Sequence, residues 1–365
     1  MKLTAEETAW AAHGFTREIA RLAERPVRIM EVCGTHTVSI FRNGIRQLLP
    51  ANVELVSGPG CPVCVTPNEY LDTAIAFSQR PDTILATFGD MLKVPGSHST
   101  LLAQKAQGAD IRIVYSPLDS LTIARERPDK DVVFLAVGFE TTAPTAAATL
   151  LQAERLKLTN FFLLPAHKLV PPALRALLSA PDIRVDGFLL PGHTAAISGL
   201  EPYRFVAAEY HKPAVVTGFE ALDILQGIYM LLTQIACGHA EIGNQYRRVV
   251  KPAGNVAAVS ILRQVYQPVT TVWRGLGAIE DSGLAIRPEF DRFDAGTQLP
   301  LPAVVTQEPA GCRCGEVLCG RIRPEACPHF GGNCTPEHPV GACMVSVEGA
   351  CAAWYKYGQG RWNYA

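Results

Sequence analysis

The chain has 365 residues and a formal net charge of −1, with 48% hydrophobic and 18% charged residues. A chain of this length and composition is long enough for roughly two or three domains with a substantial core. The near-zero net charge, without a basic stripe or an acidic tail, excludes nucleic acid and anionic membrane surfaces as expected partners.

The N-terminal residues predict an amphipathic helix rather than a targeting segment. Residues 1–26 carry glutamates throughout, lack the apolar stretch of a signal peptide, and contain Thr4 and Glu7 as a capping box. We expect this helix to pack on the last region of the chain. No apolar run reaches the roughly 18 residues of a membrane span, so we expect a cytoplasmic protein without a membrane partner. In that compartment, clustered cysteines bind metal or do redox chemistry more often than they form structural disulfides.

Eight short apolar runs, separated by helical stretches, follow this helix. They predict parallel strands, because strands that are covered on both faces are apolar throughout. The triplet Gly-Phe-Glu follows two of these runs, at 138–140 and 218–220, which favours two similar α/β domains. We place the domains at residues 27–128 and 129–221. The runs are residues 27–32, 53–56, 83–88, 111–115, 132–137, 160–164, 185–190 and 214–217.

The remaining residues, 222–365, form a third region of different character. Residues 222–246 predict one long helix or two short ones interrupted at Gly238, and residues 261–273 have mixed periodicity. Residues 308–341 are rich in proline and glycine and have too few apolar residues to build a core, so a metal is expected to hold them together. The predicted fold class is therefore α/β, with two similar parallel-sheet domains and a third, helical and loop-rich domain.

Seven of the 11 cysteines lie between residues 312 and 351. A cubane iron–sulfur cluster needs four thiolates, and Cys314, Cys327, Cys334 and Cys351 form one possible set, with Cys312 as an alternative to Cys314. Zinc is the competing metal, but zinc sites usually combine two closely spaced cysteine pairs, whereas the spacings here are wide and uneven. The spacing therefore favours an iron–sulfur cluster over zinc, and either metal over unligated thiols.

Cys33, Cys61 and Cys64 follow the first two predicted strands. Because sites in parallel sheets lie beyond the carboxyl ends of the strands, these cysteines can face each other across one crevice. The Cys-x-x-Cys spacing of Cys61 and Cys64 is typical of a redox or metal-binding pair. Cys33 lies three residues before His36, which could accept the thiol proton or bind metal. Taken alone, Cys33 could equally be a small buried core residue.

Polar residues also follow three later strands. Glu140, His167 and His193 each come at or just after a strand end, where they could contribute polar contacts to the same crevice. The alternative for the histidines is an ordinary core or surface position. The alternative for the stretch at Glu140 is N-capping of the following helix.

Five motifs, in this order, resemble the HypD family of hydrogenase maturation factors. A single one of them would be weak, whereas five in order are specific, and the resemblance runs from about residue 28 to the C-terminus. The motifs are EVCGTH at 31–36, GPGCPVC at 58–64, GFETTAPT at 138–145, LPGH at 190–193 and GACMVS at 341–346.

The resemblance implies a fold and a function. It implies two similar α/β domains and a third domain that carries a [4Fe–4S] cluster. It also implies a redox-active scaffold rather than a simple turnover enzyme, on which the Fe(CN)2CO group of [NiFe]-hydrogenase is assembled together with a small partner, HypC. Cyanide would arrive from HypE, and the loaded iron would pass to the hydrogenase large-subunit precursor.

Carried over by motif, the resemblance also implies residue roles. Cys33 would bind the nascent iron, and Cys61 and Cys64 would be the redox pair. The choice between Cys312 and Cys314 stays open. The implied cluster ligands are Cys314, Cys327, Cys334 and Cys351, and the other catalytic candidates are His36, Glu140 and His193.

Two other classes of protein are compatible with these cysteines. The first is a self-contained dithiol–disulfide oxidoreductase linked to an iron–sulfur cluster, which needs Cys61 and Cys64 but no third thiol at Cys33. The second is a zinc-bound interaction module, which would contain no iron.

Overall fold

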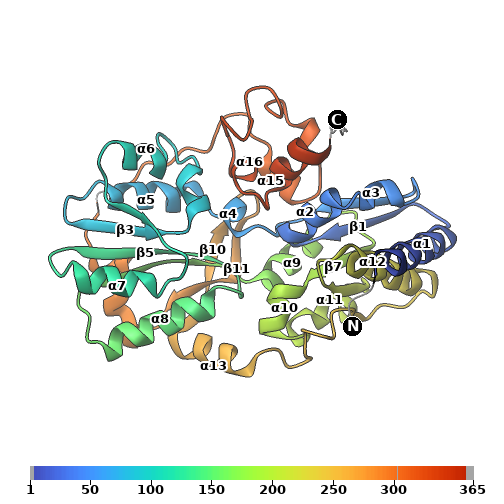
Figure 1. The fold of residues 1–365 in the computed structure, drawn as a ribbon, viewed down its shortest axis with the longest axis horizontal. Helices are drawn as coiled ribbons and strands as arrows, with labels where there is room; N and C mark the ends of the chain where they lie inside the picture. Colours follow the sequence, from blue (N-terminus) through green and yellow to red (C-terminus); the bar gives the residue numbers. More distant parts are fainter. Residues whose placement is uncertain (1–3, 302, 359–365) are drawn as a thin grey trace.

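The computed structural model describes residues 4–301 and 303–358. Two parallel sheets lie beside one another, and the cysteine-rich C-terminal region lies over their junction (Figure 1). Sheet A has the strand order β2-β1-β7-β8-β9, and sheet B has the order β4-β3-β5-β6. Every neighbouring pair in both sheets is parallel, which confirms the predicted α/β fold class. The strands are β1 (Val27–Glu31), β2 (Val53–Ser57), β7 (Gly187–Pro191), β8 (Ala214–Thr217) and β9 (Ile242–Asn244) in sheet A, and β3 (Thr83–Thr87), β4 (Ile111–Ile113), β5 (Asp131–Gly138) and β6 (Phe161–His167) in sheet B.

The eight apolar runs all form strands, but the chain passes from sheet A to sheet B and back again. β1 and β2 belong to sheet A, β3 to β6 form sheet B, and β7 returns to pair with β1. The expected boundary between residues 128 and 129 falls between β4 and β5, which lie in the same sheet, so it does not separate the sheets. An apolar run indicates that a strand is buried, but it carries no information about which distant strand lies next to it.

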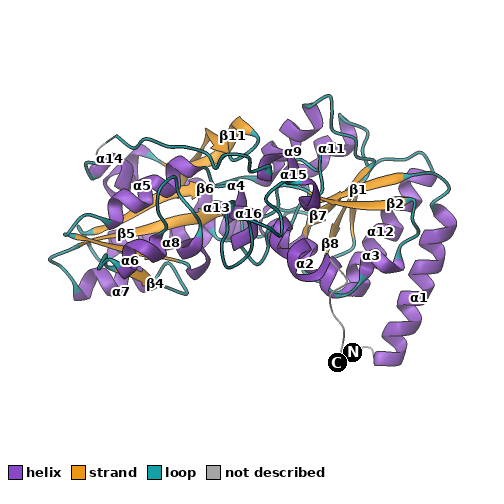
Figure 2. Ribbon diagram, turned by 90° about the horizontal axis from the view of Figure 1, so that it is seen from above, coloured by secondary structure: helices purple, strands orange, loops and turns teal. Residues whose placement is uncertain are grey.

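Helices cover both faces of each sheet (Figure 2). Successive side chains of β1 face opposite layers: Ile29 packs in the cluster that contains α12, and Met30 packs in the cluster that contains α9. The helices at sheet A are α1 (Ala5–Leu22), α2 (Gly34–Arg42), α3 (Ile45–Leu48), α9 (Val170–Ser179), α10 (Gly192–Ser198), α11 (Arg204–Ala208) and α12 (Ala221–Ala236). Those at sheet B are α5 (Asn68–Ser78), α6 (Leu101–Ala106), α7 (Asp119–Glu126), α8 (Ala143–Arg155) and α13 (Val256–Val265).

Shorter helical segments complete the structure. Helix α4 (Pro62–Val65) lies at the junction of the sheets, below the C-terminal region (Figure 1). The C-terminal segments are α14 (Ala295–Gln298), α15 (Cys314–Leu318), α16 (Ala342–Val345), α17 (Ala350–Ala353) and a π-helical turn at Trp354–Gly358. Turns of 3-10 helix occur at Gly89–Lys93, Glu201–Tyr203, Pro288–Phe293 and Pro324–Ala326. This loop-rich arrangement agrees with the expectation for the end of the chain.

The N-terminal helix α1 begins with the predicted capping box and packs against α12. The amide of Glu7 donates to the hydroxyl of Thr4 at 3.2 Å, and the amide of Thr4 donates to the carboxylate of Glu7 at 2.8 Å. α12 lies in the range expected to form the third region, but its apolar side chains cover sheet A. α1 is therefore an outer layer of sheet A. Within the described residues, no helix is long and apolar enough to cross a membrane.

A β-hairpin, β10 (Tyr266–Trp273) and β11 (Gly277–Ile286), differs from the sequence-based expectation. The mixed periodicity of residues 261–273 arises because α13 ends at Val265 and β10 begins at the next residue. The helix expected over residues 222–246 ends at Ala236. Gly238 then adopts a left-handed φ of 63°, and the chain enters β9 rather than a second helix.

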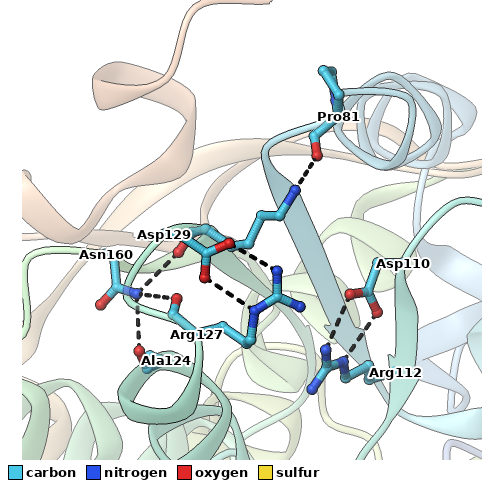
Figure 3. Close-up of polar contacts among 8 residues, drawn as sticks. Pro81, Asp110, Arg112, Ala124, Arg127, Asp129 and Asn160 are labelled. Atoms are coloured by element: carbon cyan, nitrogen blue, oxygen red, sulfur yellow. Dashed lines mark hydrogen bonds and ion pairs between the residues drawn. The ribbon is translucent and has the colours of Figure 1, made fainter.

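Asn160 joins α7 to the beginning of β5 and β6 (Figure 3). Its side-chain amide donates to the backbone carbonyls of Ala124, Arg127 and Lys130 at 2.9, 3.0 and 2.9 Å. Asn160→Ala removes this shared donor, and we expect the free energy of unfolding to fall by about 2 kcal/mol, measured by urea denaturation. Asp129→Asn is the control, because it breaks only an exposed ion pair, which contributes little to stability. Equal losses in the two variants would contradict this assignment.

Candidate iron and thiol site

The N-terminal cysteine motifs lie at one edge of sheet A, where β1 and β2 end side by side. Cys33 precedes α2, and the amide of Gly34 donates to the carbonyl of Gly60 at 2.9 Å. A Cβ atom at Gly60 would lie 2.2 Å from the backbone nitrogen of Cys33, so only glycine permits this contact. The two motifs are therefore adjacent, as their positions at strand ends predicted.

The thiol of Cys33 is buried, with 8% of the residue exposed. Burial raises the pKa of Cys33 to about 12, although the amides of His36 and Thr35 at the start of α2 act in the opposite direction. The carboxyl of Glu31 accepts hydrogen bonds from the amide of Cys33 and the hydroxyl of Thr37, and burial raises its pKa to about 7. Cys33 is thus a neutral thiol, which must lose its proton when it binds a metal.

Two histidines near Cys33 stack on the ring of Phe219, with centroid distances of 4.7 Å for His36 and 3.9 Å for His193. Nε2 of His36 lies 3.0 Å from the carbonyl of Gly218, which can only accept, so this nitrogen carries the proton. Nδ1 of His36 is buried and has no hydrogen-bond partner in the described part of the chain. Burial lowers the pKa of His36 to about 4. The ring is therefore neutral, with one nitrogen available to accept a proton or to bind metal.

The Cys-x-x-Cys pair forms the start of α4. Cys61 precedes the helix, and its sulfur accepts a hydrogen bond from the amide of Cys64 at 3.3 Å. Cys64 is completely buried, and burial raises its pKa well above the usual value of a thiol. Its sulfur lies 4.0 Å from the carbonyl of Ala342 in α16 and interacts with the thiol of Cys343. The pair therefore contacts both the Cys33 loop and the C-terminal region.

Six of the seven C-terminal cysteines line one small cavity. The set contains all four expected ligands, the alternative Cys312, and Cys343, to which the sequence assigned no role. The thiol of Cys343 contacts those of Cys64, Cys314 and Cys351, so it connects the cavity with the Cys-x-x-Cys pair. The seventh cysteine, Cys319, instead lies 3.9 Å from the carbonyl of Gly275. The cavity cysteines are Cys312, Cys314, Cys327, Cys334, Cys343 and Cys351.

The arrangement of these thiols bears on the kind of metal group they could hold. In a cubane cluster each iron takes its own thiolate, so the ligands surround a small space rather than a single ion. The donor set here, six thiols around a small enclosed cavity, fits such a cluster.

The C-terminal region also closes over the Cys33 loop. The hydroxyl of Thr35 donates to the carboxylate of Glu348 at 2.6 Å. A Cβ atom at Gly34 would lie 2.5 Å from the carbonyl oxygen of Glu348, so glycine is required at this approach. No sequence pattern indicated Glu348, because this contact joins segments 313 residues apart.

Glu140 and His167 lie at the ends of the neighbouring strands β5 and β6 in sheet B. One carboxyl oxygen of Glu140 accepts a hydrogen bond from the amide of Val170 at 2.9 Å, and the other is buried without a partner in the described residues. Burial raises the pKa of Glu140 to about 7 and lowers that of His167 to about 3. Glu140 does not cap the following helix, α8, because its carboxyl oxygen accepts from the first residue of α9 instead.

The raised pKa of Glu140 predicts how the stability of the protein depends on pH. The folded state binds a proton at Glu140 more tightly than the unfolded state, so this stabilisation is present below about pH 4.5 and is lost as the pH rises through about 7. As the pH rises from 4.5 to 8, we expect the free energy of unfolding of Glu140→Gln to increase by about 3 kcal/mol relative to that of the wild type. Urea denaturation of both proteins across this range measures the difference. A pH-independent difference would contradict a buried, neutral carboxyl.

The fold and the site define a class of protein: two parallel α/β sheets whose junction holds buried thiols from both ends of the chain. The HypD family model, described as "Hydrogenase formation hypA family", matches residues 11–358. The chain belongs to the HypD family of hydrogenase maturation factors.

Several similar proteins share one name, and the chain aligns with each of them over nearly its whole length. The chain is 50% identical over 339 residues to "Hydrogenase maturation factor HypD" of Escherichia coli K12, covering 92% of this chain and 91% of that protein. It is 48% identical over 362 residues to the protein of this name from Rhodobacter capsulatus, with 96% of each chain covered. A third, from Cupriavidus necator, is 43% identical over 357 residues, covering 96% of this chain and 93% of that protein. The chain is therefore a hydrogenase maturation factor.

Proposed function

We propose that this maturation factor is a redox-active scaffold on which, together with HypC, the Fe(CN)2CO group of [NiFe]-hydrogenase is assembled. HypE supplies the cyanide, and the hydrogenase large-subunit precursor receives the finished group. The observation that carries the proposal is that three sets of cysteines meet at the junction of the sheets. They are Cys33, the Cys-x-x-Cys pair at α4 and the cysteines that line the cavity. An iron substrate bound there has a soft ligand and a source of electrons in one buried site.

Cys33 is the proposed ligand of the iron substrate. Iron that carries cyanide and carbonyl ligands favours soft thiolate anchoring, and Cys33 loses its proton when it binds. The unpaired Nδ1 of His36 is available as a proton acceptor or a second ligand. A scaffold that must release its product should hold iron through few protein ligands, and this pair meets that requirement.

We propose that the cysteine-lined cavity holds a [4Fe–4S] cluster, which when bound supplies single electrons. The neighbours of each thiol favour Cys312 over Cys314 as the fourth ligand. A Cβ atom at Gly341 would lie 2.7 Å from the sulfur of Cys312, and the amide of the preceding residue, Val340, donates to the sulfur of Cys334 at 3.3 Å, so these two thiols meet at one loop. The thiol of Cys314 interacts with Cys312 and also with Cys343, which leads on to Cys64. The residues that would hold the cluster are Cys312, Cys327, Cys334 and Cys351.

Cys61 and Cys64 are the proposed dithiol. On conversion to a disulfide, the pair releases two electrons and two protons, which suits a site where ligands are attached reductively. The contact between Cys64 and Cys343 places the pair directly beside the cavity. The backbone contact between Gly60 and Cys33 brings the loop before the pair next to the proposed iron ligand.

The second candidate function is a cluster-linked dithiol–disulfide oxidoreductase, which the contact between Cys64 and Cys343 also supports. Metal analysis of the protein purified without oxygen tests what the two functions share. We expect iron and acid-labile sulfide in the amounts of one cubane cluster per chain. Zinc in place of iron would contradict both functions and indicate a zinc-bound interaction module.

A further inference from the structure

The turn between β10 and β11 enters the thiol site from the side of sheet B, and none of the roles proposed above uses it. Trp273, at the end of β10, is fully buried and stacks on Phe139 of the loop after β5, with a centroid distance of 5.9 Å. Gly275 touches the C-terminal region so closely that a Cβ atom there would lie 2.1 Å from the Cα atom of Gly315. The turn is therefore fixed on both sides.

Arg274, at the tip of this turn, holds the end of α4. Its backbone amide donates to the carbonyl of Val65 at 2.8 Å. Its guanidinium donates through Nε to the carbonyl of Thr66 at 2.9 Å and through Nη2 to the side-chain oxygen of Asn68 at 2.5 Å. The side-chain acceptors begin two residues after Cys64, so the guanidinium fixes the segment that follows the Cys-x-x-Cys pair.

The guanidinium of Arg274 is buried, which is unusual for a charged side chain. Arg274 is 5% exposed, and a buried charge costs several kcal/mol unless its donors are matched by acceptors. Glu308 lies 3.7 Å away and is itself largely exposed. The next residue, Gly275, lies against Gly315 in α15, beside Cys314 of the cavity. The turn thus contacts both the segment that follows the dithiol and the C-terminal region.

We propose that Arg274 is a positioning residue that holds the Cys61–Cys64 turn against the cysteine-lined cavity and so stabilises the disulfide of this pair. The inference rests on the proposed redox role of the pair. A turn held at both ends keeps the two sulfurs near one another, which raises their effective concentration and favours the disulfide over the dithiol.

Exchange with dithiothreitol measures this equilibrium without hydrogenase. Cys61 and Cys64 lose two protons and two electrons as their S–S bond forms. Oxidised dithiothreitol takes up both as its own S–S bond opens. Trypsin cleaves after Arg46 and Lys93 but not at Arg80, which precedes a proline, so fragment 47–93 contains this pair and no other cysteine. Its mass after acid quenching and alkylation in denaturant reports the fraction of disulfide.

The test compares the full-length wild type with Arg274→Gln, Arg274→Lys and a control, Arg263→Gln, on the exposed face of α13. We expect Arg274→Gln to shift the equilibrium about tenfold towards the dithiol, which is about 30 mV for this two-electron couple. Arg274→Lys keeps the charge but loses the forked donors, so we expect a smaller shift in the same direction. Arg263→Gln should match the wild type.

An unchanged equilibrium in a folded Arg274→Gln or Arg274→Lys variant would overturn the inference and leave the proposed scaffold function untouched. Far-UV circular dichroism establishes folding, and the lysine variant carries the test if the glutamine variant does not fold. If fragment 47–93 of the wild type stays a dithiol at every dithiothreitol ratio, both the inference and the redox role of the pair fail. If only the proposed role of Cys33 fails, the predicted shift of the dithiol equilibrium in Arg274→Gln remains.

Discussion

Cys33→Ala is expected to abolish hydrogenase maturation while the protein stays folded. The substitution removes one sulfur from a residue that is 8% exposed, at a stability cost of about 1 kcal/mol. It also removes the proposed anchor of the iron substrate. Loss of an outer-sphere metal partner costs roughly 10–100-fold, so loss of the main ligand should reduce activity by more than about 100-fold. Hydrogenase activity in a strain that lacks its own HypD protein measures the effect.

Cys237→Ala is the matched control for this experiment. Cys237 is an exposed cysteine at the end of α12 and lies outside the thiol site. The control should support maturation like the wild type, and the dithiol equilibrium of Cys61 and Cys64 should persist in Cys33→Ala. Maturation that survives Cys33→Ala would exclude the scaffold function and leave the oxidoreductase as the better account.

The second large effect concerns the cluster ligands. We expect Cys312→Ala to lose most of the bound iron and sulfide, because Cys312 lies with Cys334 and Cys351 in the proposed ligand set. Cys314→Ala should keep the cluster, because Cys314 lies outside the proposed ligand set and its thiol interacts with those of Cys312 and Cys343. Iron and sulfide per chain, measured after purification without oxygen, distinguish the two variants.

Cys319→Ala is the control for the cluster experiment, since this buried cysteine contacts Gly275 rather than the cavity. It should retain iron and sulfide like the wild type. The opposite pattern, loss in Cys314→Ala and retention in Cys312→Ala, would exchange the roles of the two cysteines. Iron and sulfide retained in both variants would contradict the proposal that the cavity holds the cluster.

Most strands of the two sheets were predictable from sequence, and their partners were not. Eight strands are apolar runs that could be located with their ends nearly correct, whereas β9 lies in a range expected to be helical and was missed. The pairing of β1 with β7, however, depends on contacts such as Ile29 with Gly187, between segments that are far apart in the chain. The hairpin β10–β11 was missed because its pattern merges with that of α13, which ends where β10 begins.

Some residues of the site could likewise be placed from sequence, and others could not. Cys33 and the Cys61–Cys64 pair could be placed together because parallel strands end at one edge of a sheet. The link through Cys343 could not be found, because its thiol meets Cys64 only when the C-terminal loops fold over α4. Arg274 was missed for a similar reason, since an isolated arginine in a turn has no local signature of burial.

The infrared spectrum of the protein, purified without oxygen from cells that also produce HypC and HypE, tests the scaffold function most directly. We expect cyanide and carbonyl bands in the complex with HypC, and no such bands in the same complex made with Cys33→Ala. Iron and sulfide of one cluster should be present in both. A cluster without cyanide or carbonyl bands under every condition of co-production would contradict the scaffold function.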